Sequence, residues 1–495
     1  MSDTDLALRL ARYLAETGAD GAVEVFDIKR IHGGASRETY RFKARMGGEV
    51  HSLILRRDPV SSLIETERAV EFNAYRAFHG TKVPVPRPIA LELTGEWLDR
   101  PFFIMEEIQN AQVGSVLAPD PYAPHAQAIG EQFWSILGEI AKSDHALAAL
   151  RDGLEAPAPE AAHLRALDHW EKVIDEDEIA PQPIVRAAIR YLRRNPPSPA
   201  QRISVVHGDY RTGNFLHDGA GRITAILDWE MAHLGDPLED LAWALDPLWA
   251  HHNPERPAGT LPRAEAIKIW ERASGLVAQP AALTWWSLFA MVKGAAIWIS
   301  SLREFHDGTN TDPVMVFSGL YCLSFHNRLI AATLAPDVPV VSEPPAEPER
   351  TLCVLGQLLM GQIAPQLEGS YAQGSASTIG IMLLAAGVEA ERAVDVRVKE
   401  NAEMRAVLTK AAETISPGDH GFLSFHEALT LAARGQDSSY RLSELDAANA
   451  GLRRLIIDLQ AYLETHALPD KKELEGTLWR VLKNSAERRS ITLPI

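Results

Sequence analysis

Hydrophobic and polar positions along the first hundred residues predict one helix followed by strands. Leu6, Leu10 and Leu14 recur at four-residue spacing, which places them on one face of a helix. Polar and apolar residues then alternate in ETYRFKARM (38–46) and in HSLILRRD (51–58). Because successive side chains of a strand point to opposite faces, this alternation predicts an antiparallel hairpin.

The pattern changes again before the middle of the chain. Residues 62–79 have helical spacing, and PIALELTGEW (88–97) and PFFIMEEI (101–108) predict another pair of strands. From 125 to 335 the spacing is mainly helical, apart from a short strand–loop–strand unit at 203–229. The sequence therefore predicts an α+β fold, in which a β-rich part with one helix precedes a helical part.

A proline-rich segment divides the chain. Five of the thirteen residues in PDVPVVSEPPAEP (336–348) are proline, so this segment cannot join a helix or a central strand. Every pattern beyond it is helical. We predict four parts: an N-terminal β-rich lobe (1–108), a helical lobe (109–335), a proline-rich linker (336–348) and an all-helical domain (349–495).

Composition and charge exclude several classes of protein. A net charge of −17 argues against broad binding to nucleic acid or to anionic membranes. The only cysteines are Cys322 and Cys353, which rules out a disulfide framework and a cysteine-ligated metal site. The first residues lack the basic segment of a secretory signal, and the longest apolar run (379–388) is about half the length of a membrane helix. We therefore expect a cytoplasmic protein without membrane insertion.

The most informative segment is ISVVHGDYRTGNFLHDGAGRITAILDWEMAHLGDPLEDLAW (203–243). An apolar strand precedes Asp209, Asn214 follows five residues later, and a second apolar strand ends at Asp228. We expect these two carboxylates and the amide to emerge at the ends of adjacent short strands, close enough to share one polyphosphate. Asp, Asn and Gly also mark ordinary turns, but the spacing combined with two apolar strands favours a functional site.

Phosphoryl transfer requires this combination of side chains. A carboxylate such as Asp209 can orient an attacking hydroxyl and accept its proton. Asn214 and Asp228 offer hard oxygen ligands to Mg²⁺, which binds proteins through few side chains together with phosphate oxygens. The sequence thus predicts a site at which Mg²⁺ and a nucleoside triphosphate meet an acceptor hydroxyl.

The motifs HGDYRTGN, ILDWE and LGDPLEDLAW resemble the catalytic core of the aminoglycoside phosphotransferase and choline kinase-like family. Within it they look most like the branch found alone in bacteria or fused to acyl-CoA dehydrogenases. The resemblance covers roughly residues 20–330 and implies a two-lobed protein-kinase-like fold. It also implies that Asp209 is the catalytic base and that Asn214 and Asp228 are the metal ligands. The C-terminal segment resembles a helical domain of unknown function that is seen appended to such kinases.

Three further residues of this segment receive supporting roles from the resemblance. His207 would brace the catalytic loop, and Asp236 and Asp240 would anchor the segment that follows the metal site. For the two aspartates an ordinary alternative stays open, since either could cap the helix that begins before LAWAL.

The N-terminal lobe has a weaker resemblance to the nucleotide-binding part of the family. IHGGASRETYRF (31–42) resembles the turn that covers the nucleotide, in which Gly33 and Gly34 lack side chains and allow backbone amides to approach phosphate. Ser36 would contact a phosphate. The segment lacks the G-x-G-x-x-G spacing, so on its own it could be an ordinary turn.

The lysine that binds phosphate in this family is replaced here. Arg56 ends the strand LILRRD at the place where the lysine normally stands, and arginine keeps the charge but has a different geometry. The resemblance makes Glu71 its partner, although a solvated helix charge is the alternative. Backbone groups from Glu106 to Ile108 would form the hinge that faces adenine.

The function predicted from these features is transfer of the γ-phosphoryl group of ATP, with Mg²⁺, to a hydroxyl of a small molecule. The family branch suggests a hydroxyacyl-CoA or a related metabolite, while an aminoglycoside, choline or a hydroxy amino acid stays open. A catalytically silent nucleotide-binding module is the main alternative, and a hydrolase that uses water is a weaker one. The C-terminal helices could cap the acceptor site, mediate homodimer formation or dock a partner.

Overall fold

The computed structural model describes residues 3–17, 22–31, 38–58, 68–116, 118–250, 252–341, 348–415 and 423–491. Its contacts divide the chain into two compact units. The first comprises Met1–His169, Pro196–Ala290 and Glu368–Tyr371, and the second comprises Trp170–Asn195, Met291–Leu367 and Ala372–Ile495. The domain bounds predicted from the sequence stay a prediction.

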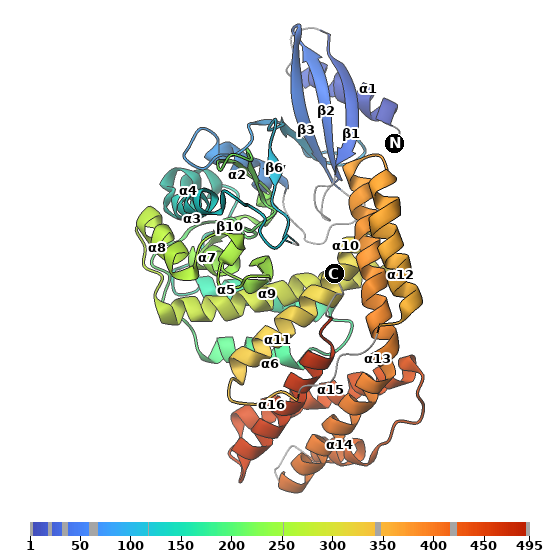
Figure 1. The fold of residues 1–495 in the computed structure, drawn as a ribbon. Coiled ribbons are helices and arrows are strands. Elements are labelled where there is room, and N and C mark those ends of the chain that lie inside the picture. The colour runs from blue at the N-terminus through green and yellow to red at the C-terminus, as the bar shows by residue number, and fades with distance from the viewer. Residues whose placement is uncertain are drawn as a thin grey trace. The chain divides into compact units, whose positions relative to one another are not determined.

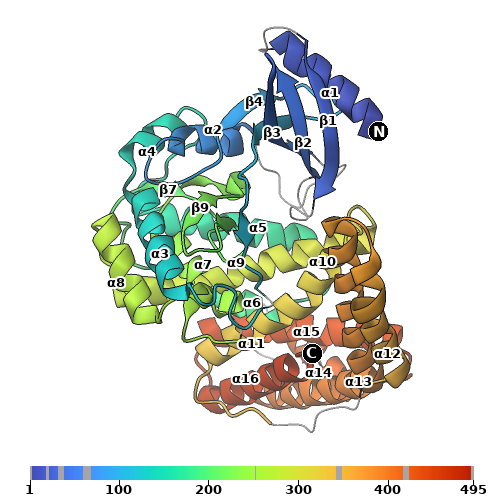
Figure 2. The ribbon, with the colours of Figure 1, turned by 45° about the horizontal axis from the view of Figure 1, so that its top comes forward.

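The first unit contains a five-stranded antiparallel sheet with the strand order β1-β2-β3-β5-β4. Helix α1 (Asp3–Thr17) covers one face of this sheet (Figures 1 and 2). The strands are β1 (Glu24–Ile31), β2 (Glu38–Met46), β3 (Glu49–Arg57), β4 (Pro88–Glu92) and β5 (Phe102–Glu106).

The contact between α1 and the sheet follows from the spacing of its apolar residues. Leu6, Leu10, Tyr13 and Leu14 are all buried, and they pack into the cluster formed by the inward side chains of the sheet. The ring of Tyr13 meets Phe102 edge-on, with 4.9 Å between ring centroids. Burial of each leucine contributes about 1.5–3 kcal/mol, so this stripe is sufficient to dock the helix.

The predicted hairpin of the sheet is confirmed, but the pattern missed its first strand. β2 and β3 pair from Glu38–Arg57 to Met46–Glu49 through a tight turn. β1 was not predicted because its pairing with β2 is interrupted between Phe26 and Lys29, where Asp27 has a φ of 56°. Such a bulge breaks the two-residue alternation on which strand prediction depends.

The rest of the first unit is mainly helical and holds two small sheets, in which β10 pairs with β7 and β6-β8-β9 lie in that order. Its strands are β6 (Gln112–Val113), β7 (Ser204–Val206), β8 (Phe215–His217), β9 (Ile223–Ile226) and β10 (His233–Gly235). Its helices are α2 (Arg68–Phe78), α3 (Ala126–Lys142), α4 (Asp144–Leu150), α7 (Leu238–Ala244) and α8 (Arg263–Ser274), with short turns η1 (Trp229–Met231), η2 (Pro247–Ala250) and η3 (Pro257–Gly259). Helices α5 (Ala162–Asp177) and α9 (Pro280–Asp307) contribute residues to both units.

Every regular element among the described residues of the second unit is a helix. It contains α6 (Pro183–Arg194), α10 (Pro313–Phe317), η4 (Ser318–Cys322), α11 (Leu323–Leu334), α12 (Arg350–Leu358), η5 (Leu359–Ile363), η6 (Ala364–Gln366), α13 (Ser370–Thr414), α14 (Leu423–Arg434), α15 (Leu442–Thr465) and α16 (Lys471–Arg488). The expectation of an α+β fold followed by an all-helical segment is therefore confirmed.

A buried polar cluster joins three helices of the second unit. Glu400 of α13 accepts hydrogen bonds from Ser485 of α16, from Arg489 and from Asn449 of α15. Burial alone would raise the pKa of Glu400, but Arg489 outweighs it and lowers the pKa. Because a buried charge is stable only when it is paired, this cluster fixes how the three helices pack.

Two helices differ from the expectation drawn from apolar runs. By length and composition alone, Pro280–Asp307 and Pro313–Leu334 are apolar enough to cross a membrane. In the first, 78% of the apolar window is buried inside the protein, as in the core helix of a soluble domain, and in the second 44% is buried. A count of uninterrupted apolar residues does not find these two helices, because polar and charged residues interrupt their apolar runs.

Candidate active site

Asn214 and Asp228 lie at the same end of one strand pair. β8 begins directly after Asn214, and β9 ends two residues before Asp228. The strands pair through Phe215 and Ile226, and the N–H of Leu227 donates to the carbonyl of Asn214 at 2.9 Å. The amide and the carboxylate therefore emerge together, as predicted.

Asp209 reaches the same place from a different sheet. It follows β7, which pairs with β10 rather than with β8 or β9, so the expectation that all three residues leave adjacent strands is wrong for Asp209. The side chains nevertheless meet, because Nδ2 of Asn214 donates to Oδ2 of Asp209 at 2.6 Å and to its backbone carbonyl at 2.9 Å. The path of the loop between β7 and β8, which holds both Asp209 and Asn214, brings Asp209 into the site.

Two residues that the sequence did not single out hold the Asp209 carboxylate. Trp243 Nε1 donates to Oδ1 at 2.8 Å, and Arg211 Nε lies 3.0 and 3.1 Å from the two oxygens. The guanidinium of Arg211 lies over the ring of Trp249, 4.7 Å from its centroid. These donors, with Asn214, fix the orientation of the carboxylate before any ligand binds.

His207 is fully buried and connects the loop that holds Asp209 with the residues that follow β9. Its Nδ1 accepts the backbone N–H of Asp209 at 3.1 Å, so its Nε2 carries the proton that is donated to the carbonyl of Leu227 at 2.9 Å. Burial lowers the pKa of His207, which keeps the ring neutral, as this pair of contacts requires. His207 thereby links Asp209 to the strand that carries Asp228.

Asp240 holds the backbone of the same loop. One oxygen accepts the N–H of His207 at 2.6 Å and the other accepts the N–H of Gly208 at 2.9 Å. Gly208 has a φ of +85°, and a Cβ on it would lie 2.4 Å from the carbonyl oxygen of Met231. Asp240 thus connects α7, which lies in the segment after Asp228, with the loop that leads to Asp209.

Asp236 has a different position and acts at the start of α7. Its Oδ1 accepts the N–H of Leu238 at 2.9 Å, and its Oδ2 accepts Trp286 Nε1 at 3.2 Å. Burial raises the pKa of Asp236 to about 6. Its bond to Leu238 is that of the helix-capping alternative, whereas its bond to Trp286 anchors the start of α7 to α9.

Arg56 connects the five-stranded sheet with the metal-ligand candidates. Its Nη1 donates to Glu71 and its Nη2 to Asp228, each at 2.7 Å, and both Arg56 and Glu71 are buried. Burial alone would raise the pKa of Asp228, but the Arg56 guanidinium outweighs it and lowers the pKa. The solvated-charge alternative for Glu71 is therefore wrong.

The backbone at Asp228 is held in an uncommon conformation. Its φ of 67° and ψ of 57° are left-handed, and its N–H donates to the hydroxyl of Tyr75 at 2.9 Å. Strain of this kind in a residue other than glycine persists only where surrounding contacts enforce it, and it is frequent at functional sites. Tyr75 lies one helical turn after Glu71, a spacing that could have identified it in the sequence.

The remaining predicted nucleotide contacts are not joined to this cluster. Glu106 ends β5 and binds the backbone N–H of Arg87 at 2.9 Å, and Ile108 lies in the coil that follows. Within the described residues, no contact connects either with Asp209 or Arg56. Gly33, Gly34 and Ser36 lie outside the described residues.

Comparison with known proteins identifies the family. Residues 27–276, just over half of the chain, match the phosphotransferase enzyme family. This chain belongs to that family. The matched segment includes every site residue named above except Trp286, and the predicted resemblance and the kinase-like fold are confirmed.

The curated relatives of this chain are longer proteins. It is 25% identical over 240 residues to the mouse acyl-CoA dehydrogenase family member 10, which covers 48% of this chain and 22% of the relative. It is 28% identical over 237 residues to the probable acyl-CoA dehydrogenase IBR3 of Arabidopsis thaliana. This match covers 44% of this chain and 28% of that protein. The chain thus spans less than a third of the length of these two relatives.

Solved structures include a Ralstonia eutropha protein assigned to the aminoglycoside phosphotransferases. It is 22% identical to this chain, with a TM-score of 0.49, and the match covers 64% of this chain and 95% of that one.

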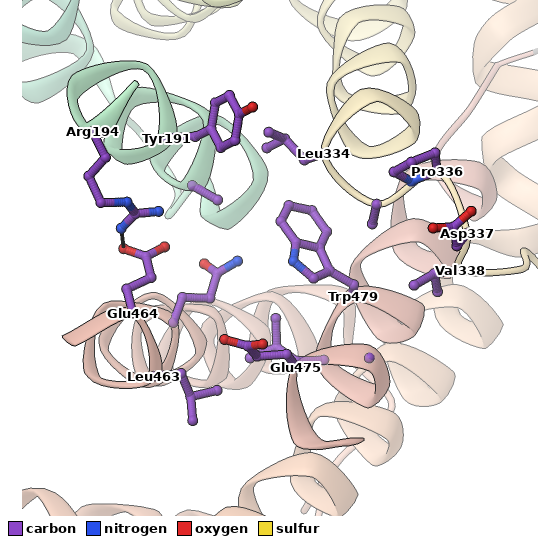
Figure 3. A pocket seen from close by; sticks show the side chains of 15 residues that line it. Tyr191, Arg194, Leu334, Pro336, Asp337, Val338, Leu463, Glu464, Glu475 and Trp479 are labelled. Atoms are coloured by element: carbon purple, nitrogen blue, oxygen red, sulfur yellow. Dashed lines mark hydrogen bonds and ion pairs between the residues drawn. The ribbon is translucent and has the colours of Figure 1, made fainter. Parts of the chain in front are cut away.

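A cavity of about 390 Å³ lies elsewhere, within the second unit. Trp479 of α16 projects into it opposite Tyr191 of α6, and Arg194 pairs with Glu464 at its edge (Figure 3). Its lining contains none of the predicted site residues.

Proposed function

We propose that this chain transfers the γ-phosphoryl group of Mg·ATP to a hydroxyl of a small molecule. The observation that carries the proposal is the convergence of two segments: Asn214 binds Asp209 at 2.6 Å within the loop between β7 and β8, and Asp228 leaves the same strand pair as Asn214. Membership of the phosphotransferase family supports the same reaction class.

Asp209 is proposed as the group that orients the acceptor hydroxyl and accepts its proton. Its carboxylate is held by Trp243, Arg211 and Asn214, so its direction is set in advance. Positioning of this kind accounts for much of phosphoryl-transfer catalysis, because the protein takes no covalent part in the reaction.

The donor set fits Mg²⁺. Nδ2 of Asn214 is bound to Asp209, so its Oδ1 is the atom left for a cation, and it accepts no hydrogen bond from a described residue. One carboxylate oxygen of Asp228 accepts a hydrogen bond from Arg56, and the second oxygen of the same carboxylate is the one proposed to bind the cation. Two such ligands suffice, because Mg²⁺ takes its remaining ligands from phosphate and water. Bound Mg²⁺ would neutralise phosphate charge at this position.

Arg56 is proposed as the cation that meets the nucleotide phosphates, with Glu71 holding it. Gly33, Gly34, Ser36 and the backbone of 106–108 are proposed for the rest of the ATP site. The pairing of Arg56 with Asp228 also favours one rival function. A metal must share Asp228 with a guanidinium, which is the observation that supports a silent nucleotide-binding module.

A hydroxyacyl-CoA or a related hydroxy metabolite is the proposed acceptor. The curated relatives are named as acyl-CoA dehydrogenases, enzymes of acyl-CoA substrates. Arg211 supports an anionic acceptor, because its partly exposed guanidinium lies beside Asp209, where it would repel a cation such as choline. A cytoplasmic location is part of the proposal.

Enzyme assays with a panel of acceptors test this function. ADP release should be measured with Mg·ATP and hydroxyacyl-CoA, choline, a hydroxy amino acid or an aminoglycoside, for the wild type and for Asp209→Asn. We expect release with the CoA ester and wild type only. Release without any acceptor would indicate a hydrolase, and nucleotide binding without release would indicate the silent module.

A further inference from the structure

The strongest unexplained feature is a nearly uncharged helical hairpin, which belongs to the second unit except for Glu368–Tyr371. It consists of α12, the two short turns after it and the first half of α13, residues 350–388. Between positions 351 and 388 the sequence has one charged residue, Glu368. In a chain that is 23% charged, 38 residues would hold about nine.

Large apolar side chains of this hairpin face solvent. Five of them are between 38% and 51% exposed: Val354, Leu355, Leu358, Ile363 and Ile379. Val354 and Leu358 are one helical turn apart, and Leu355 adjoins both, so they form a continuous face on α12. Contiguous exposed apolar surface on a soluble protein marks an interaction site more often than chance exposure does.

This face is not needed for packing within the hairpin. α12 and α13 lie side by side (Figures 1 and 2) and approach through glycine, where a Cβ on Gly356 would lie 2.6 Å from the carbonyl oxygen of Gly380. The N–H of Glu349 donates to the carbonyl of Gly387 at 2.8 Å. The two helices therefore approach closely at their glycines, where Leu384 and Met360 also pack, while Val354, Leu355 and Leu358 of α12 stay exposed.

We propose that this face binds the same face of a second copy of the chain, in a twofold-symmetric dimer. Each copy carries a net charge of −17, so most of its surface repels another copy. A twofold interface places identical residues opposite each other, and the hairpin is uncharged and apolar over the whole face. Pairing through this face therefore brings no like charges of two acidic chains together.

A membrane fits this face less well than a second copy. The described helices that are long and apolar enough to span a bilayer are at Pro280–Asp307 and Pro313–Leu334, outside the hairpin. Arg350 is the one basic residue at its edge, whereas surface binding to anionic lipid needs several. The exposed part of α12 with η5 is about 20 Å long at 1.5 Å per residue. A contact of that size predicts a reversible dimer.

Sedimentation velocity of the full-length chain over a range of concentrations tests this proposal. We expect the wild type to shift from 54.4 kDa towards twice that mass as its concentration rises. Leu355→Glu should weaken dimerisation at least tenfold, because the twofold axis would bring carboxylates together. Leu431→Glu on α14 is the matched control, since Leu431 is also exposed and should tolerate the same change. Circular dichroism verifies that each variant is folded.

Hydrogen–deuterium exchange of the wild type gives a second measurement that needs no variant. Amides of 350–379 should become more protected at high concentration, while those of α14 should not. A wild type that stays monomeric at every concentration would overturn the proposal, as would Leu355→Glu dimerising like Leu431→Glu. Flotation of monomeric chain with phosphatidylcholine vesicles would also overturn it, because it would assign the face to lipid.

Discussion

The carboxylate of Asp240 accepts the backbone N–H of His207 at 2.6 Å, and its second oxygen accepts that of the following glycine. This residue of α7 thereby sets the path of the chain immediately before Asp209. The contact is buried and charge-assisted, a kind of hydrogen bond that contributes about 1.5–3 kcal/mol. Asp240 therefore connects the stability of the helical part with the geometry of the proposed base.

Asp240→Asn should lower both stability and turnover. An amide presents an N–H group to one of the two backbone donors, so one hydrogen bond is replaced by a repulsive contact. We expect a loss of about 2 kcal/mol in the free energy of unfolding and a lower kcat with little change in the KM for ATP. Urea denaturation and steady-state kinetics measure the two effects. Unchanged kcat would show that the loop keeps its path without Asp240.

Removal of the Arg56 charge should destabilise the protein more than its conservative replacement. Arg56→Ala leaves Glu71 buried without its partner, and breaking a buried pair in this way costs about 3–5 kcal/mol. Arg56→Lys keeps the charge but not the two-pronged contact with Glu71 and Asp228, so its loss should be smaller. Urea denaturation of both variants measures the difference. Equal losses of unfolding free energy in the two variants would show that the positive charge of Arg56 does not stabilise the protein.

Because of the raised pKa of Asp236, the free energy of unfolding should fall as the pH rises. Its pKa is raised by burial to about 6, so between pH 4 and pH 6 the native state binds more protons than the unfolded state. The stabilisation that this carboxyl group provides is present below its pKa in the unfolded state. It is lost as the pH rises through its pKa in the folded state. With about 1.4 kcal/mol for each pKa unit, the loss is up to about 3 kcal/mol. Asp236→Asn should flatten the decline in unfolding free energy across this range, and a slope equal to that of the wild type would contradict the assignment.

Asp228→Ala should remove the magnesium dependence of nucleotide binding. Calorimetric titration of the wild type with ATP should give an affinity at least tenfold higher with Mg²⁺ than without it, a difference of about 1.4 kcal/mol. The variant should bind ATP equally in both conditions. Asp144→Ala, at an exposed carboxylate that pairs with Arg202, is the control. Retained magnesium dependence in Asp228→Ala would remove Asp228 as a ligand.

Local patterns predicted most of the elements near the site and failed where long-range packing decides. Alternation identified β2 and β3, and the motif HGDYRTGN identified Asp209 and Asn214. Trp243 was not predicted as a site residue, because its partner Asp209 lies 34 residues earlier in the chain. Its place three residues after Asp240, on the same face of α7, is the signal that could have revealed it.

The roles of Asp236 and Asp240 show the limit of spacing as evidence. Both lie near the start of one short helix and carry the same group, yet Asp236 binds the N–H of Leu238 and Trp286 of α9, and Asp240 binds a loop more than thirty residues earlier. Sequence spacing states which residues share a helix face, but not what packs against that face. Only the folded chain separates the two.

The fate of the γ-phosphoryl group tests the central claim most directly. Full-length wild type and Asp209→Asn should each be incubated with Mg²⁺, ATP labelled with ¹⁸O in its γ-phosphoryl group and a metabolite extract supplemented with hydroxyacyl-CoA. Mass spectrometry then locates the label. We predict labelled phosphate on a hydroxyl metabolite with the wild type and none with Asp209→Asn. Label found only in inorganic phosphate, or retained in ATP, would contradict a small-molecule kinase.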